Sequence, residues 1–410
     1  MLKKIIRIAS ILIIGIILGG LFLILSYLLP SNVIEKNIAK SIEIFEKEEK
    51  YESDIYGYRN TKLDNFTDAI MLQNASYTGN ESLIDKAMNV YRYNNDDDPG
   101  KSLINQINNK NNEKIDYSRY WHGYLIILKP LLLLFSYNDI RFINTIIQPL
   151  LVLSIVYLMI KKKKENYIIP YVISILMISP NTIAKSMQYS TIFYLFNLAM
   201  LFMLLYNDKL KNKYPYFFLI MGMLTSYFDF LTYPLATLGM TLITYFILNN
   251  EKKLSNNIKT IILLSFMWGI GYIGMWVGKL VLGSILLNDN LFSSALERFS
   301  TRVSLETTNG SFTIFEVLKR NIYRYVNKPY FLLLLFIIGY TIFKTKFKIK
   351  RETCISIIPF IIISIMPFAW YIVTSNHSYI HCWFTYRTLI ITIFSTLCIF
   401  TNLIYKNKEK

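Results

Sequence analysis

Apolar stretches long enough to cross a lipid bilayer recur along this chain and limit what it can fold into. A helix of about 20 apolar residues spans a hydrocarbon core of roughly 30 Å, and unpaired backbone groups are too costly there for an open irregular chain. Hydrophobic residues make up 53% of the 410 positions. The sequence predicts an all-α, polytopic membrane helix bundle of about ten spans, near 5–29, 139–160, 167–185, 190–206, 215–230, 232–249, 260–287, 329–343, 353–374 and 384–404.

Clusters of basic residues alternate with these spans and predict an orientation. By the positive-inside rule their side is cytoplasmic, so both termini are expected inside a cell membrane. The net charge of +17 is then mostly topogenic and indicates no nucleic-acid partner. The bias towards Lys, Ile and Asn is typical of an AT-rich bacterial gene. The clusters include Lys3, Lys4, Arg7, Lys161 to Lys164, Lys209, Lys211, Lys213, Lys252, Lys253, Lys259, Lys344, Lys346, Lys348, Lys350, Arg351, Lys406, Lys408 and Lys410.

Charge and hydropathy divide the chain into five parts. We expect a first transmembrane anchor at 1–30, retained because its apolar run is longer than a signal-peptide core. An extracytoplasmic loop follows at 31–138, then a bundle of spans two to seven at 139–290. A second extracytoplasmic helical loop at 291–328 precedes spans eight to ten at 329–410.

The long outer loop is expected to pack on the outer ends of the spans. Residues 32–50 have the periodicity of an amphipathic helix. Residues 122–135 are predicted to form a helix lying along the membrane interface, with Lys129 snorkelling to water.

All three histidines lie in two aromatic and basic segments, each where a predicted span meets the outer surface. The first segment, Ser118–Tyr124, contains His122, and the second, Asn376–Arg387, contains His377 and His381. Aromatic residues at this depth are also the ordinary interfacial belt. Together the segments favour a site for a polar substrate carried on a lipid.

The order of features over residues 1–210 resembles the GT-C superfamily of membrane glycosyltransferases, with protein O-mannosyltransferases and aminoarabinose transferases as the nearest relatives in layout. A single span precedes a long outer loop, an aromatic-histidine segment and an interfacial helix. Three motifs follow in order: Asp139–Asn144 opening the second span, Ile178–Pro180 closing the third, and Gln188–Tyr194. The resemblance implies a polyprenyl-phosphate sugar donor and an extracytoplasmic glycan acceptor attacking the anomeric carbon, usually with inversion.

The resemblance also implies an acidic residue of the first outer loop as general base or metal ligand. Asp68 is the preferred base, with Asp54 and Asp64 as alternatives and His122 as a further candidate. Asp64 and Asp68 are four apart, so one helical face could carry both. The competing interpretation is structural, with Asp64 or Thr67 as the N-cap of a helix. A divalent cation is left open as a cofactor.

A polyprenyl phosphate needs cations near the outer interface. Candidates are Arg298 and Arg302, Arg320 beside Arg324, and Arg387. A capping box from Thr313 to Glu316 is predicted to open the helix that carries Arg320. The competing interpretation is salt bridging to Glu297, Glu306 and Glu316. The remaining candidate substrate-binding residues are Arg119, Trp121, His122, His377 and His381.

Two charged residues are predicted within or beside the spans. Charges at such depth usually point into the bundle or a wet cavity. Lys279 is expected to hold the lipid phosphate, or to pair with Asp229. The spacing of His377 and His381 also suits two ligands of one metal, but no third histidine or HExxH pattern accompanies them, so no metal site is assigned.

Two other classes compete with the transferase hypothesis. A polysaccharide polymerase usually carries its large outer loop later in the chain, and a lipid-linked sugar flippase needs a charged path through the bilayer, to which only Lys279 points. A solute transporter would show inverted repeats and broken helix pairs, which are not seen in the sequence.

Overall fold

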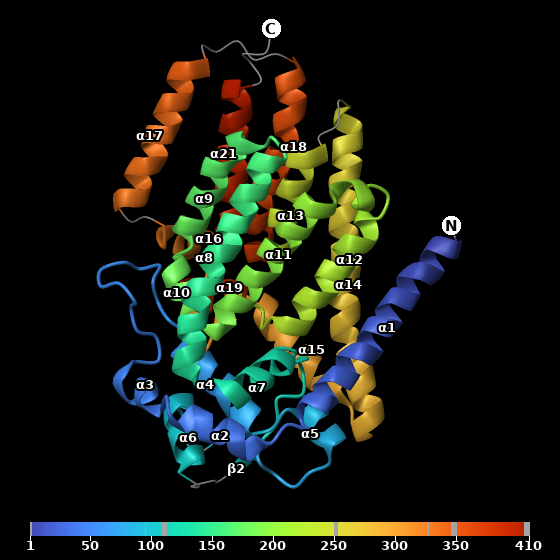
Figure 1. Ribbon diagram of the computed structural model, residues 1–410, viewed down its shortest axis with the longest axis vertical. Helices are drawn as coiled ribbons and strands as arrows, with labels where there is room; N and C mark the ends of the chain where they lie inside the picture. The colour runs from blue at the N-terminus through green and yellow to red at the C-terminus, as the bar shows by residue number, and fades with distance from the viewer. Residues whose placement is uncertain are drawn as a thin grey trace.

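In the computed structural model the chain forms a bundle of long helices closed at one end by a layer of short ones (Figure 1). Residues 2–94, 96–108, 113–249, 253–325, 328–345 and 351–405 are described. Six segments in these ranges are long and apolar enough to cross a membrane. They are α1 (Leu2–Ser26), α8 (Tyr137–Lys161), α11 (Met187–Leu210), α14 (Leu254–Leu287), α18 (Arg351–Val373), and Cys382–Ile404, which contains α20 (Cys382–Thr385), η2 (Tyr386–Leu389) and most of α21 (Ile390–Tyr405).

The other predicted spans fall on shorter or less apolar helices. The stretch 167–185 follows η1 (Glu165–Tyr167) and is divided into α9 (Ile168–Met177) and α10 (Pro180–Ala184). The break has a local cause, because Ser179 adopts a left-handed φ of 61° and a residue before proline is disfavoured in an α-helix. The others are α12 (Tyr214–Phe228), α13 (Leu235–Asn249) and α17 (Lys328–Thr345).

The prediction of an all-α helical bundle is therefore confirmed, and six of its helical segments in the described chain, against about ten predicted, are long and apolar enough to be candidate spans. Lys252, Lys346, Lys348, Lys350 and the lysines at 406, 408 and 410, which contributed to the predicted orientation, lie outside the described residues. The centre of the bundle is tightly packed where α12 crosses α14. A Cβ added at Gly222 would lie 2.0 Å from the Trp268 carbonyl oxygen, and one at Gly271 would lie 2.0 Å from that of Leu219.

Residues 31–136 form the layer that closes the bundle, and we call it the cap. The predicted helix at 32–50 is interrupted at Lys40 and Ser41, which separate its two halves. A two-stranded antiparallel sheet pairs Arg92 with Ile115 in the cap. The cap contains α2 (Ser31–Ala39), α3 (Ile42–Lys47), α4 (Asn65–Ser76), α5 (Leu83–Asn89), β1 (Arg92–Asn94), α6 (Pro99–Ile107), β2 (Glu113–Ile115) and α7 (Leu125–Leu134).

Two buried lysines make contacts within the cap and between the cap and α14. The Lys129 side chain does not snorkel, and that prediction was wrong: it is fully buried, and its Nζ donates to the Ala75 carbonyl oxygen at 2.9 Å. Lys279 of α14, also fully buried, donates to the Met88 carbonyl oxygen at 2.7 Å. Both carbonyls lie in the last turn of a cap helix, where backbone oxygens lack intrahelical partners and the helix dipole favours a cation.

A second group of short elements lies beside the cap, at the same end of the bundle. The predicted capping box is confirmed, because Thr313 Oγ1 accepts from the Glu316 amide while the Glu316 carboxylate accepts from that of Thr313. Asn321 donates to the Ser378 carbonyl oxygen at 2.9 Å and holds α16 against α19. The elements are α15 (Leu291–Val303), the hairpin of β3 (Glu306–Thr307) and β4 (Gly310–Ser311), α16 (Ile314–Tyr323) and α19 (Ser375–Ile380).

Candidate functional site

A cavity of about 130 Å³ lies where the cap meets α11, α15 and α19. Six segments far apart in the sequence contribute to it. A larger groove of about 380 Å³ between α8, α9 and α11 is almost wholly apolar and holds no titratable side chain. We therefore place the candidate site in the smaller cavity, which is lined by Tyr51, Asp64, Phe66, Thr67, Ile70, Tyr117, Gln188, Phe230, Arg302, His377, His381, Trp383 and Phe384.

Asp64 supplies a carboxylate to this cavity. It is the N-cap of α4, as the structural interpretation predicted, and its Oδ1 accepts from the Thr67 amide at 3.1 Å. Its Oδ2 is buried and has no hydrogen-bond partner among the described residues. Only 1% of the residue is exposed, and this burial raises the pKa of Asp64 to about 7. A carboxylate with that pKa can accept a proton near neutral pH.

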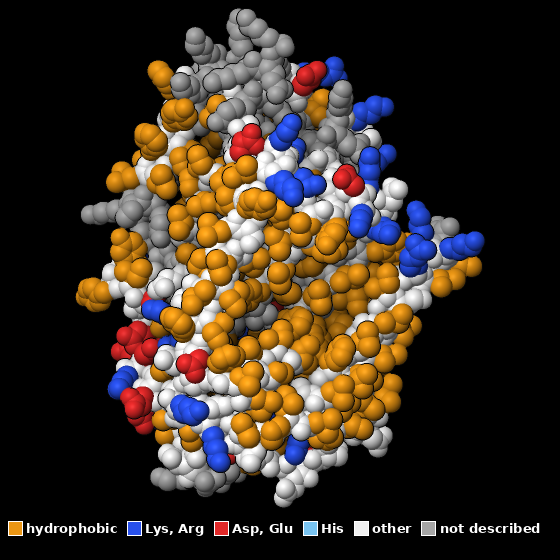
Figure 2. Space-filling view, in the orientation of Figure 1, with side chains coloured by type: hydrophobic (Ala, Val, Ile, Leu, Met, Phe, Trp, Pro, Cys, Tyr) orange, Lys and Arg blue, Asp and Glu red, His pale blue; other side chains and the backbone are white. Residues whose placement is uncertain are grey.

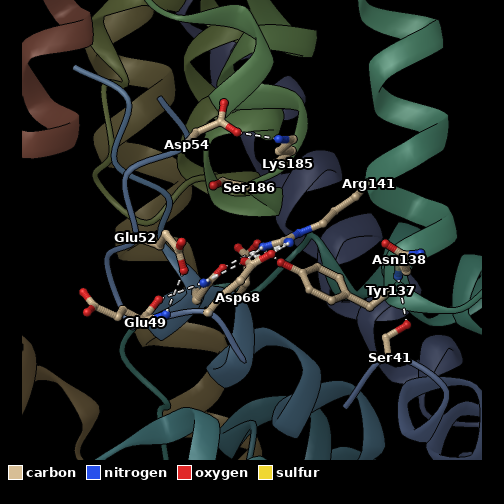
Figure 3. A network of polar contacts seen from close by, with 12 residues as sticks. Ser41, Glu49, Glu52, Asp54, Asp68, Tyr137, Asn138, Arg141, Lys185 and Ser186 are labelled. Atoms are coloured by element: carbon tan, nitrogen blue, oxygen red, sulfur yellow. Dashed lines mark hydrogen bonds and ion pairs between the residues drawn. The ribbon is translucent and has the colours of Figure 1, made fainter. Parts of the chain in front are cut away.

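Asp68, the preferred base in the sequence, does not line the cavity. It is fully buried, and its Oδ2 accepts from the Tyr137 hydroxyl at 2.6 Å and from the Met187 amide at 2.9 Å. Its Oδ1 accepts from the Gln188 amide at 3.2 Å. Burial raises the pKa of Asp68 to about 6. Both oxygens are occupied, so Asp68 joins α4 to α8 (Figure 3) and to the first turn of α11.

A polar network continues from Asp68 to α8 and α10 (Figure 3). Arg141 of α8 binds the Glu48 carboxylate through Nη1 at 2.8 Å and also donates to Asn65, the first residue of α4. Asp54 forms an ion pair with Lys185 and accepts from Asn181 of α10. These contacts make Asp54 a link between cap and bundle, outside the cavity.

The two histidines of the second segment face the cavity as fixed tautomers. His377 Nε2 lies 2.6 Å from the Leu231 carbonyl oxygen, so Nε2 carries the proton and Nδ1 is an acceptor. His381 Nε2 lies 3.0 Å from Arg302 Nη1. A guanidinium only donates, so His381 Nε2 accepts and its Nδ1 carries the proton.

Both histidines are held neutral. Burial lowers the pKa of His377 well below its usual range, and burial together with Arg302 lowers the pKa of His381 to about 3. Neither ring therefore supplies positive charge at physiological pH, and the single cationic side chain among the cavity-lining residues is Arg302.

Five polar atoms around the cavity are buried without a hydrogen-bond partner in the described part of the chain. Nearly all buried polar atoms in folded proteins have a partner. A group of unpaired atoms around one space therefore indicates a ligand that pairs with them. The five atoms are Asp64 Oδ2, Gln188 Oε1, His377 Nδ1, His381 Nδ1 and Trp383 Nε1.

The first histidine segment stands behind the cavity wall. His122 Nε2 donates to the Tyr117 carbonyl oxygen, 2.8 Å away, and its ring centre lies 4.9 Å from that of Phe230. Burial lowers the pKa of His122 to about 3. Trp121 points away and donates to the Met275 carbonyl oxygen at 2.6 Å. The segment supports Tyr117 and Phe230, which line the cavity.

The remaining predicted site residues also lie outside the cavity. Asp229 accepts from Thr232 and shapes the turn that presents the Leu231 carbonyl to His377. Arg119 lies 5.5 Å from the centre of the Tyr117 ring. Arg298 is exposed on α15.

Two further arginines and Lys279 have structural contacts. Arg320 stacks over Tyr379 at 3.6 Å, and buried Arg387 stacks over Tyr189 at 4.0 Å. Lys279 forms no ion pair with Asp229 in the described chain, and its Nζ donates instead to the Met88 carbonyl oxygen. No salt bridge joins the predicted outer arginines to Glu297, Glu306 or Glu316 within the described ranges.

Sequence reasoning did not single out Tyr51, Tyr117 or Gln188, which line the cavity. Gln188 was noted only as part of a motif, and Tyr51 and Tyr117 were not considered. None of the three has a local sequence signal, because only tertiary packing brings them to one cavity. The described residues contain no group of three or more His, Cys, Asp or Glu side chains that could hold a metal ion.

Comparisons of the chain with protein-family models, with curated proteins and with solved structures find no match.

Proposed function

We propose that the protein is a membrane glycosyltransferase of GT-C type, which moves a sugar from a polyprenyl-phosphate carrier to an extracytoplasmic glycan or lipid. The unpaired carboxylate oxygen of Asp64 carries this proposal, because it shares a cavity with the Arg302 guanidinium at the junction of bundle and cap. A general base and a cation beside one small space are the two groups that transfer from a phosphate-linked donor requires.

In the proposed reaction, Asp64 Oδ2 takes the proton of an acceptor hydroxyl. The acceptor oxygen then forms a bond to the anomeric carbon of the sugar, and the bond from that carbon to the phosphate oxygen breaks. The bonding electrons leave with the polyprenyl phosphate, whose added negative charge lies beside Arg302. The resemblance of residues 1–210 to GT-C enzymes implied an acid of the first outer loop in this role, and we now assign it to Asp64 in place of Asp68.

The proposed topology puts the cap and the cavity outside a bacterial cell membrane and both termini inside. It is supported by α8, which leaves the cap at Tyr137 and ends at Lys161, roughly 37 Å away for 25 residues at 1.5 Å each. Basic side chains gather at the upper right of Figure 2, around the far end of the bundle from the cap. With the shorter helices included as spans, the count of about ten is retained in this proposal.

The test is transfer by the full chain in proteoliposomes supplied with radiolabelled polyprenyl-phosphate sugars and cell-envelope acceptors. Asp64→Asn is the decisive variant, because asparagine still caps α4 but is not a base. We expect transfer to fall by about 10²–10⁴-fold. Asp54→Asn, which alters a carboxylate outside the cavity, is the matched control. Unchanged transfer by Asp64→Asn, or movement of labelled lipid across the bilayer without any transfer, would overturn the proposal.

A further inference from the structure

We infer that the cavity binds the sugar ring of the carrier as a neutral polyol and that the carrier phosphate stays outside it. The inference rests on the proposed function and adds which part of the donor occupies the space. It follows from the hydrogen-bonding character of the five unpaired atoms, from the position of the one lining cation, and from the size of the cavity.

Three of the unpaired atoms accept hydrogen bonds and two donate. Asp64 Oδ2, Gln188 Oε1 and His377 Nδ1 are acceptors, whereas Trp383 Nε1 and His381 Nδ1 carry protons. A hydroxyl group both donates and accepts, so the hydroxyls of the sugar ring can pair with four of these atoms, while the acceptor hydroxyl pairs with Asp64 Oδ2. An ionised phosphate has only acceptors and would leave the three acceptor atoms unpaired and facing its negative charge.

The distribution of charge also indicates that the sugar ring, and not the phosphate, occupies the cavity. His377 contributes no positive charge, because its neutral ring carries a single N–H, at Nε2, which forms a hydrogen bond to the Leu231 carbonyl oxygen. Arg302 is half-buried, whereas Asp64 and His377 are 1% and 2% exposed. The cation therefore lies on the outer side of the cavity and the acceptors lie deep within it. A sugar phosphate enters with its ring inwards, so that the phosphate remains beside Arg302.

The volume of about 130 Å³ excludes an occupant larger than one ring. Pockets for drug-sized ligands are larger, at about 300–1,000 Å³. Tyr51 and Trp383, whose ring centres are 4.8 Å apart, add flat apolar surfaces that match the C–H faces of a pyranose.

The test measures binding by saturation-transfer NMR on the detergent-solubilised full chain. The probes are methyl glycosides of glucose, galactose, mannose and N-acetylglucosamine, their monodeoxy analogues, and inorganic phosphate. We expect at least one glycoside to bind, a monodeoxy analogue of it to bind at least about tenfold more weakly because a buried partner is left unpaired, and phosphate not to compete.

Gln188→Ala removes one acceptor and should weaken glycoside binding about tenfold. Gln148→Ala is the matched control, because Gln148 is also buried with an unpaired Oε1 but lines the apolar groove. Competition by phosphate, equal binding of every deoxy analogue, absence of glycoside binding, or unaltered binding by Gln188→Ala would each overturn the inference. Glycoside binding without any transfer activity would instead uphold it and refute the proposed function.

Discussion

Asp64 and Asp68 are four residues apart at the start of one helix. We expect substitution of Asp68 to lower stability and substitution of Asp64 to abolish transfer. Asp68 accepts three hydrogen bonds from fully or nearly fully buried groups, namely the Tyr137 hydroxyl and the amides of Met187 and Gln188. Asp68→Ala leaves all three donors without that partner. At about 1–3 kcal/mol for each unsatisfied buried group, the expected loss is roughly 3–6 kcal/mol, allowing for partial relaxation.

A loss of that size is large for a folded protein, whose free energy of unfolding is typically about 5–15 kcal/mol. Asp64→Asn, by contrast, keeps the N-cap acceptor for Thr67 and should change stability by less than about 1 kcal/mol. Stability is measured as the thermal unfolding temperature of the detergent-solubilised variants, monitored by size-exclusion fluorescence. Catalysis is measured as the transfer rate of the fraction that remains folded.

We therefore expect Asp68→Ala to unfold at a clearly lower temperature, and Asp64→Asn to unfold near the wild-type temperature but without activity. The comparison has a refuting result. If Asp68→Ala unfolds like the wild type and its folded fraction has lost transfer, Asp68 and not Asp64 is the base, and the assignment made from the hydrogen bonds is wrong.

Three other measurements probe different parts of the structure. Burial, with a smaller contribution from the Asp68 carboxylate, raises the pKa of Asp64 to about 7 against the lowering by Thr67 and Arg387, so transfer should rise as pH increases through about 7 and then level off. A flat pH–rate profile across that range contradicts the role of Asp64 as base. Arg302→Ala removes a charge-assisted contact worth about 1.5–3 kcal/mol, so the KM for the lipid donor should rise about 10- to 150-fold, and an unaltered KM would exclude Arg302 from phosphate binding. Gly271→Ala should lower the free energy of unfolding by about 1–3 kcal/mol, because the added Cβ meets the Leu219 carbonyl oxygen. Gly269→Ala is the control on the same helix and should be neutral or stabilising, because its Cβ would enter open space. Equal unfolding temperatures for the two variants would contradict the close crossing of α12 and α14.

Local features of the site could be predicted from sequence because they depend on neighbouring residues. The N-cap at Asp64 and the capping box from Thr313 to Glu316 each involve side chains and amides three residues apart. The second histidine segment and Arg302 were also among the predicted site residues, and the structure brings them together at one cavity.

The choice between Asp64 and Asp68 could not be made in the same way. Both carboxylates had a suitable spacing and setting in the sequence. Asp68 is occupied by donors from Tyr137 and Met187, which lie 69 and 119 residues away. Lys129 was misjudged for the same reason, since its partner Ala75 is 54 residues distant and becomes available only where α4 ends against α7.

The sequence by itself determined that this chain forms long apolar helices, because segments of that length and apolarity fit a bilayer only when the backbone pairs its own polar groups. It also placed histidine, arginine and acidic residues at one predicted face. Only the tertiary structure decided which of them share a cavity and which are bonded elsewhere. That outcome depends on long-range contacts that saturate Asp68 and leave one oxygen of Asp64 unpaired.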